Sequence, residues 1–274
     1  MRPHVEVRQT GGATYLLAHG MSVGSYEEQA RVVQSPVYVP VAEGAGKLIP
    51  IGGAANEGNF KLLSRHVVEG TGVTVITFPT EIPEKRFDDV KGPLVNQRVR
   101  GAVFHLRHDL LPDIGEMMIK RSSLVFITGG NQVRGKQMLE ETRLKDVVLD
   151  SLKAGKTVAG TSAGAHLMGR MMPFEDKVVN GSGFTSLGID THFRQLNRYS
   201  RQEGFVEQTG EISLGLDEAT GIIYQNGLGS VIGDGEAVVR YHNGVMEEPI
   251  RLREGDIFDF RALGSYVDSF KVAA

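Results

Sequence analysis

The sequence predicts an α/β fold in which a mostly parallel sheet lies between two layers of helices. Short apolar runs rich in β-branched residues recur along the chain without alternating polar residues, which is typical of strands buried on both faces. Helical patterns separate these runs, as the crossover connections of parallel strands require. Glycine-rich turns follow three of the runs, at the strand ends where such sheets bind their ligands.

The individual elements follow from the same patterns. Five parallel strands are expected, over residues 47–51, 73–78, 99–106, 124–128 and 157–159. Helices are expected over residues 60–69, 112–121, 132–139, 142–154 and 165–172. The glycine-rich turns come after Ile51, Thr128 and Ala159, so we expect the chemistry of the protein at that edge of the sheet.

The last third of the chain has a different character. Residues 221–225 and 237–241 are typical of strands, and His242-Asn243-Gly244 suits a tight hairpin turn. Two further strands, over 248–253 and 257–260, would complete a small antiparallel part at the edge of the sheet.

The first forty residues stand outside this rhythm. They hold a candidate strand at 14–18, a helical pattern at 26–33, and then the breakers Ser35-Pro36 and Pro40. We interpret residues 1–40 as an N-terminal extension or arm. Residues 41–274 form one predicted α/β domain, because no internal repeat or low-complexity linker divides them.

Composition excludes several classes of function. The 274 residues contain no Cys, which rules out disulfides, thiolate metal sites and cysteine nucleophiles. The net charge of -3 argues against broad nucleic-acid binding, which needs a basic surface. We expect no membrane partner and a cytoplasmic location, since there is no apolar run of about 20 residues and no signal-peptide pattern. We expect no cofactor. We also expect no metal, because His105 and His108, the one pair spaced like metal ligands, would face opposite sides of a strand.

A nucleophile motif follows the last parallel strand. Gly160-Thr161-Ser162-Ala163-Gly164 matches G-x-S-x-G, in which small neighbours allow a serine on a sharp strand-to-helix turn. A second match surrounds Ser22, but it precedes the α/β pattern. A structural glycine-rich turn without catalytic function is the alternative for both matches.

Several stretches, taken together, resemble one known family. They are Ile49-Pro50-Ile51-Gly52-Gly53-Ala54, Phe126-Ile127-Thr128-Gly129-Gly130-Asn131-Gln132, the motif around Ser162, Asp190-Thr191-His192-Phe193 and Leu216-Asp217-Glu218. Over roughly residues 47–260 the chain resembles the cyanophycinase and aspartyl dipeptidase family of serine peptidases. The resemblance implies a flavodoxin-like α/β sandwich related to the class I glutamine amidotransferases, and it implies a homodimer.

The resemblance also implies a catalytic set: Ser162 as nucleophile, His192 as general base, and Glu218 as the carboxylate that orients the imidazole. Glu175 is the alternative carboxylate. Backbone N–H groups near Gly130 and of Ala163 would form the oxyanion hole. His166, four residues after the serine, would either reach back to the hydroxyl or pack against the sheet, and we favour packing.

Substrate-binding positions are implied in the same way. Arg194, Arg198 and Arg201 would share one face if their stretch is helical, and such a face would clamp carboxylates. The resemblance favours Arg198 and Arg201. Asp190 is a further substrate-binding candidate, which would counter a cationic group or order the loop. Asn131 and Gln132 would either bind substrate amides or cap the following helix.

Two positions depart from the family pattern. Thr191 stands where cyanophycin-cleaving relatives usually carry Gln, and Leu196 where they carry Arg. From the resemblance as a whole, the predicted function is a serine peptidase. It would cleave an amide or isopeptide bond, such as β-aspartyl-arginine or a related acidic peptide, through an acyl-enzyme. The alternatives are an aspartyl dipeptidase acting on short peptides and a non-catalytic relative that binds a peptide or small ligand.

Overall fold

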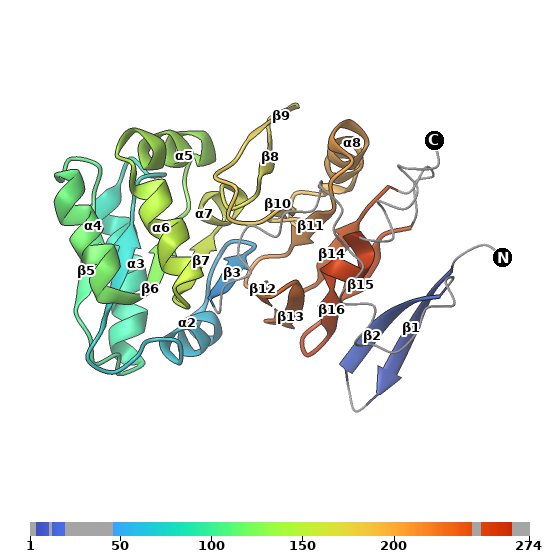
Figure 1. The fold of residues 1–274 in the computed structure, drawn as a ribbon, viewed down its shortest axis with the longest axis horizontal. Helices are drawn as coiled ribbons and strands as arrows, with labels where there is room; N and C mark the ends of the chain where they lie inside the picture. Colours follow the sequence, from blue (N-terminus) through green and yellow to red (C-terminus); the bar gives the residue numbers. More distant parts are fainter. Residues whose placement is uncertain (1–3, 11–12, 20–45, 243–247, 265–274) are drawn as a thin grey trace.

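A computed structural model describes residues 4–10, 13–19, 46–242 and 248–264 of the chain. Its main feature is an eight-stranded sheet with the order β16-β13-β12-β3-β7-β6-β4-β5 (Figure 1). Five neighbouring strands are parallel, namely β3 (Lys47–Ile51), β7 (Thr157–Thr161), β6 (Ser122–Ile127), β4 (Gly72–Ile76) and β5 (Val103–Leu106). The predicted fold class, a mostly parallel sheet between helices, is confirmed.

Helices cover both faces of the parallel strands, as continuous apolar runs require. On β6, Val125 and Ile127 face one apolar cluster, whereas Leu124 and Phe126 face another. The first cluster includes side chains of α4 (Pro112–Arg121), α5 (Gln132–Glu141) and α6 (Leu144–Lys153). The second includes side chains of α2 (Glu57–Ser64) and α3 (Pro83–Asn96). The two layers hold the strand ends, and hence the turns that follow them, in fixed positions.

Some elements differ from their sequence predictions. Helix α3 was not expected, because only Val90 and Leu94 are buried in it and Pro93 lies inside it. The predicted strand at 99–106 begins only at Val103, and α2 ends at Ser64 rather than at residue 69.

The predicted helix at 165–172 is wrong. Helix α7 covers only Ala163–His166, and β8 (Met171–Phe174) then pairs with β9 (Lys177–Asn180) in a hairpin. A Cβ atom on Gly169 would lie 2.7 Å from the carbonyl oxygens of Leu187 and Met171, so this glycine permits a close turn of the backbone.

The antiparallel part is divided between two sheets. Strands β12 (Gly221–Gln225) and β16 (Ile257–Asp259) lie where strands were predicted, and with β13 (Leu228–Ile232), which was not predicted, they extend the main sheet beyond β3. Strands β14 (Ala237–Arg240) and β15 (Ile250–Leu252) instead join β10 (Gly188–Thr191) and β11 (Ser213–Leu216) in a second, four-stranded sheet. Within it, β10 and β11 are parallel. The predicted turn at Asn243-Gly244 lies outside the described residues.

At the N-terminus, β1 (His4–Thr10) and β2 (Ala13–His19) form an antiparallel pair near β16 (Figure 1). Strand β2 confirms the strand predicted at 14–18. Ser22, the helical pattern at 26–33 and the breakers up to Pro40 lie outside the described residues. In the part of the chain that the structure describes, no helix is long and apolar enough to span a bilayer. The division at residue 40 stays a prediction.

Candidate active site

Ser162 lies on a strained turn between β7 and α7. Its backbone adopts φ 53° and ψ -120°, a conformation that costs residues other than glycine about 1–3 kcal/mol. The turn depends on the flanking glycines, since a Cβ atom on Gly164 would lie 2.2 Å from the carbonyl oxygen of Ile127. The N–H of Ser162 donates to the carbonyl of Ile51, at 3.0 Å, on the neighbouring strand. The strand-to-helix context predicted for the motif is therefore present.

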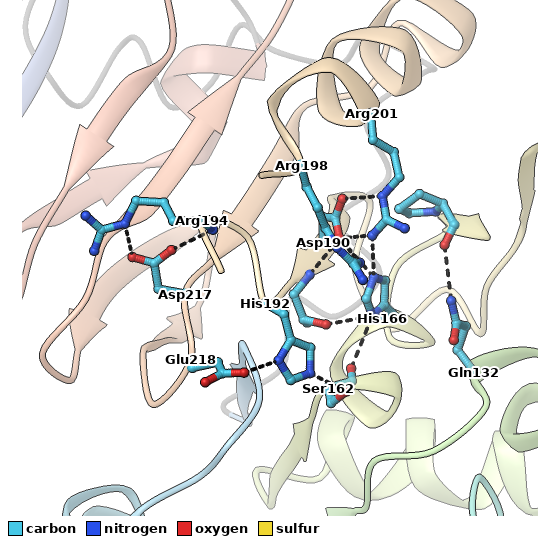
Figure 2. A network of polar contacts seen from close by, with 12 residues as sticks. Gln132, Ser162, His166, Asp190, His192, Arg194, Arg198, Arg201, Asp217 and Glu218 are labelled. Carbon is cyan, nitrogen blue, oxygen red and sulfur yellow. Dashed lines mark hydrogen bonds and ion pairs between the residues drawn. The ribbon is translucent and has the colours of Figure 1, made fainter. Parts of the chain in front are cut away.

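His192 lies between Ser162 and Glu218 (Figure 2). Its Nε2 is 2.8 Å from Oγ of Ser162, and its Nδ1 is 2.7 Å from Oε1 of Glu218. His192 directly follows β10, and Glu218 closely follows β11, so two neighbouring parallel strands deliver both residues to one edge. Glu175, the alternative carboxylate, lies in the turn between β8 and β9.

Gly52 and Gly53, which follow β3, pack against the imidazole of His192. The N–H of His192 donates to the carbonyl of Gly52 at 2.6 Å, and that of Ala219 donates to Gly53 at 2.8 Å. Gly53 has φ +115°, and a Cβ atom there would lie 2.2 Å from Cε1 of His192. Gly53 thus leaves the space that the ring occupies, a role that the sequence signalled only as a glycine pair after a strand.

The second glycine turn, after β6, runs beside the serine. A Cβ atom on Gly129 would lie 3.3 Å from Cβ of Ser162, so the backbone of this turn closely approaches the serine. Gly130 has φ +144° and packs against the carbonyl oxygen of Pro79. Ala163 is the first residue of α7, where N–H groups have no partner within the helix.

Asn131 and Gln132 make contacts within the chain. The side chain of Asn131 accepts a hydrogen bond from the N–H of Arg134 at 3.0 Å and so caps α5. Nε2 of Gln132 donates to the carbonyl of Pro173, at 3.2 Å. The capping alternative therefore describes Asn131, whereas Gln132 links α5 to the β8–β9 hairpin.

Asp190 is the centre of a buried polar cluster, with 1% of its surface exposed. Its Oδ1 accepts hydrogen bonds from Nη1 of Arg198 at 2.8 Å and from the N–H of Thr191 at 2.8 Å. Nε of Arg201 donates to Oδ2 at 2.8 Å, and Nη2 of the same residue donates to Oδ1. His166 contacts the same carboxylate. Arg198 and Arg201, both implied as substrate ligands, therefore already form hydrogen bonds with Asp190 inside the protein.

The three arginines do not share a helix face. Helix α8 (Tyr199–Thr209) begins after Arg198, and Arg194 lies in the preceding turn. Arg194 turns to Asp217, whose Oδ2 is 2.5 Å from its Nε, and this hydrogen bond raises the pKa of the guanidinium. The stretch from Arg194 to Arg201 is not one continuous helix, so the prediction that the three arginines share a helix face is wrong.

The turn between His192 and α8 contacts the backbone of both His192 and Glu218. Leu196 is 57% exposed, and its N–H donates to the carbonyl of His192 at 2.9 Å. Oε1 of Gln195 accepts the N–H of Glu218 at 3.2 Å, a contact that the sequence analysis missed. This turn therefore borders both His192 and Glu218.

The two histidines weighed as metal ligands lie away from Ser162 and His192, on and after β5. His105 stacks on Phe87 with ring centroids 4.3 Å apart, and its Nε2 is 3.0 Å from Oγ1 of Thr77. Burial lowers the pKa of His105. Over the described ranges, no three His, Asp or Glu side chains gather as a metal site would require.

Comparison with known proteins now adds the family. The model of peptidase family S51 matches residues 84–232. The chain belongs to this family. A cyanophycinase from Geminocystis herdmanii is 31% identical over 163 residues, which are 49% of this chain and 58% of that protein. A cyanophycinase from Trichormus variabilis is 29% identical over 136 residues, which are 44% of this chain and 46% of that protein.

Solved structures share the fold. A peptidase from an acI-B1 Actinobacterium has a TM-score of 0.60 at 19% identity, covering 78% of this chain and 97% of that one. A putative peptidase E protein from Listeria monocytogenes EGD-e has a TM-score of 0.50 at 16% identity, covering 76% and 98%. The matches span about half the length of the curated relatives. The predicted family is confirmed, and the predicted enzyme class, a serine-type peptidase, agrees with it.

Proposed function

We propose that this chain hydrolyses an amide or isopeptide bond beside an acidic residue through an acyl-enzyme on Ser162. The observation that carries the proposal is the continuous line from Oγ of Ser162 through His192 to Glu218, with contacts of 2.8 and 2.7 Å. Serine is a weak nucleophile until a base accepts its proton, and an imidazole needs an acceptor on its other nitrogen to keep the correct tautomer.

The reaction proceeds in two halves. Oγ of Ser162 attacks the scissile carbonyl carbon while its proton passes to Nε2 of His192, and Glu218 stabilises the imidazolium. The resulting oxyanion accepts hydrogen bonds from N–H groups at Gly130 and Ala163, each worth about 2.7–4 kcal/mol. The carbon–nitrogen bond breaks as His192 returns the proton to the leaving amine. Water, deprotonated by the same nitrogen, then hydrolyses the ester.

The charge beside the triad supports an acidic substrate. Arg198 and Arg201 carry two positive charges against the single negative charge of Asp190, which leaves one positive charge. Guanidinium groups bind carboxylates through paired hydrogen bonds. In this proposal Asp190, Asn131 and Gln132 shape the pocket through their contacts within the chain.

A fluorophosphonate probe tests the nucleophile. We expect the wild-type protein to be labelled, Ser162→Ala to lose the label with its fold unchanged, and Ser22→Ala to keep it. Circular dichroism confirms folding. An unlabelled, folded wild-type protein would favour the binding alternative, and label retained by Ser162→Ala would refute the assignment.

Two matched variants separate the candidate carboxylates. Glu218→Gln should lower the rate of labelling about 10²–10⁴-fold, because the imidazole loses the partner that fixes its tautomer. Glu175→Gln should label at nearly the wild-type rate, since Glu175 lies in the β8–β9 turn. The reverse result would move the orienting role to Glu175.

A substrate panel separates the specific alternatives. Cyanophycin, β-aspartyl-arginine and short α-aspartyl dipeptides are compared by kcat/KM. Thr191 and exposed Leu196 remove an amide and a guanidinium from the pocket, so we expect short aspartyl peptides lacking arginine to be cleaved at least as well as cyanophycin. A strong preference for cyanophycin would favour the isopeptidase. The homodimer and the cytoplasmic location stay predictions, and light scattering tests the first.

A further inference from the structure

His166 is a buried histidine that the proposed reaction does not use. It lies on α7, four residues after the nucleophile, and only 4% of its surface is exposed. Its Nε2 is 3.1 Å from Oδ1 of Asp190, and its Nδ1 is 3.0 Å from Oγ1 of Thr191. Nδ1 also lies 3.3 Å from the carbonyl oxygen of Ser162 (Figure 2). The ring therefore stands between the helix of the nucleophile and strand β10.

These partners define the tautomer of the ring. Nη2 of Arg201, which can only donate, lies 3.5 Å from Nε2 of His166, but the Asp190 carboxylate, which only accepts, is closer at 3.1 Å, so Nε2 carries the proton and donates it to Asp190. Nδ1 then accepts from the hydroxyl of Thr191 at 3.0 Å, a shorter contact than the 3.3 Å approach of Nδ1 to the Ser162 carbonyl oxygen. Both ring nitrogens are satisfied within the chain, as a buried polar side chain requires.

The two ends of this link carry the reacting groups. On one side, the backbone N–H of His166 donates to the carbonyl of Ser162 at 3.0 Å, so the ring and the strained turn move together. On the other side, Asp190 and Thr191 are the two residues directly before His192. A shift of either side would change the Ser162–His192 contact, and misplacement by about 1 Å can slow a reaction about 10²-fold.

We propose that His166 is a positioning residue, which fixes the contact between Ser162 and His192 through its hydrogen bond to Asp190. The inference rests on the proposed function. Asp190 keeps its bonds from Thr191, Arg198 and Arg201 when His166 is replaced, so the arginine cluster remains. What is lost is the connection from helix α7 to Asp190 and to the hydroxyl of Thr191.

Two substitutions of His166 with side chains of different length test its hydrogen bond to Asp190. The Gln side chain of His166→Gln can still donate to Asp190, whereas the Asn side chain of His166→Asn ends near the position of Nδ1 and is too short. With a fluorophosphonate probe that has no carboxylate, the labelling rate of Ser162 reports the nucleophile without the arginines. We expect His166→Gln to stay within about 5-fold of wild type and His166→Asn to fall about 30–100-fold. His105→Asn, a histidine replaced far from the triad, should change nothing.

The outcomes separate the inference from the proposed function. Equal rates for His166→Asn and wild type would overturn the inference alone, as would equal losses in both variants that merely follow their melting temperatures. A folded wild-type protein without any labelling would overturn the proposed function itself. A ¹⁵N spectrum of the His166 ring is independent of activity: a proton on Nε2 supports the inference, and a proton on Nδ1 overturns it.

Discussion

The two sides of the candidate active site are held in place by different forces. Ser162 follows β7 of the main sheet, where apolar side chains from both helical layers bury the strands. His192 and Glu218 follow β10 and β11 of the second sheet, where the neighbouring carboxylates Asp190 and Asp217 are buried against arginines. Apolar packing thus holds the strand before Ser162, whereas on the side of His192 and Glu218 paired charges add to the apolar packing of β10 and β11.

Asp217 shows how the charged side works. It is completely buried, directly precedes Glu218, and accepts hydrogen bonds from the N–H of Arg194 at 3.1 Å and of Glu236 at 2.8 Å. Glu236 in turn accepts from Arg251 and Arg253. Because a buried charge that loses its partners is strongly destabilising, this side should respond to charge and pH, and the packed side to volume.

The two sides meet at Gly53, where we expect the largest effect on activity. Gly53→Ala places a Cβ atom 2.2 Å from Cε1 of His192, so the ring must move and probe labelling should fall by at least about 100-fold. Gly70→Ala is the matched control, since Gly70 also has a positive φ but no atom lies within 4 Å of the added Cβ. Similar labelling of both variants would contradict the positioning role of Gly53.

A pair of buried substitutions compares the two sides directly. Asp217→Ala and Phe126→Ala should each lower the free energy of unfolding by about 3–5 kcal/mol, the first by leaving the backbone N–H groups of Arg194 and Glu236 without their acceptor and the second by opening a cavity. Urea denaturation measures both. Only Asp217→Ala should also slow probe labelling of the folded protein, because Glu218 is its neighbour. Slower labelling by Phe126→Ala would remove the contrast.

The charged side should weaken in acid. Burial alone would raise the pKa of Glu236, but hydrogen bonds from Arg253 and Arg251 outweigh it and hold the pKa below its ordinary value. A carboxyl whose folded pKa is depressed stabilises the protein above its unfolded pKa of about 4.3, and this stability is lost as the pH falls through the folded pKa. Urea midpoints measured from pH 6 downwards should fall less steeply for Glu236→Gln than for wild type. Parallel curves would assign the acid sensitivity to other groups.

A surface ion pair should show the smallest effect. Arg100 and Glu69 lie 3.3 Å apart, and their side chains are 81% and 80% exposed. Water screens such pairs, so Arg100→Ala should change the free energy of unfolding by less than about 0.5 kcal/mol in urea denaturation. A larger loss would mean that charge pairs also stabilise the packed side.

Local pattern was enough for the parallel strands and for the serine turn. A strand buried on both faces needs a nearly continuous apolar run. In β6 the run is Leu124–Ile127, and in β4 the β-branched Thr74 is the only polar residue. The sequence pattern did not predict helix α3, because only two of its side chains are buried and a proline lies inside it. The early end of α7 was not predicted, because Gly169 turns the chain against the carbonyl of Leu187, a residue distant in sequence.

By itself, the sequence predicted the fold class, the serine turn and, through resemblance, His192 and the two candidate carboxylates Glu218 and Glu175. Only the tertiary structure decided that Glu218 rather than Glu175 meets the imidazole, that Asp190 and Asp217 take different arginines, and that His166 joins the two sides. The physical reason is range. Apolar period and turn chemistry act between neighbouring residues, whereas a hydrogen bond across 26 positions exists only once the pairing of β10 with β11 has set both ends.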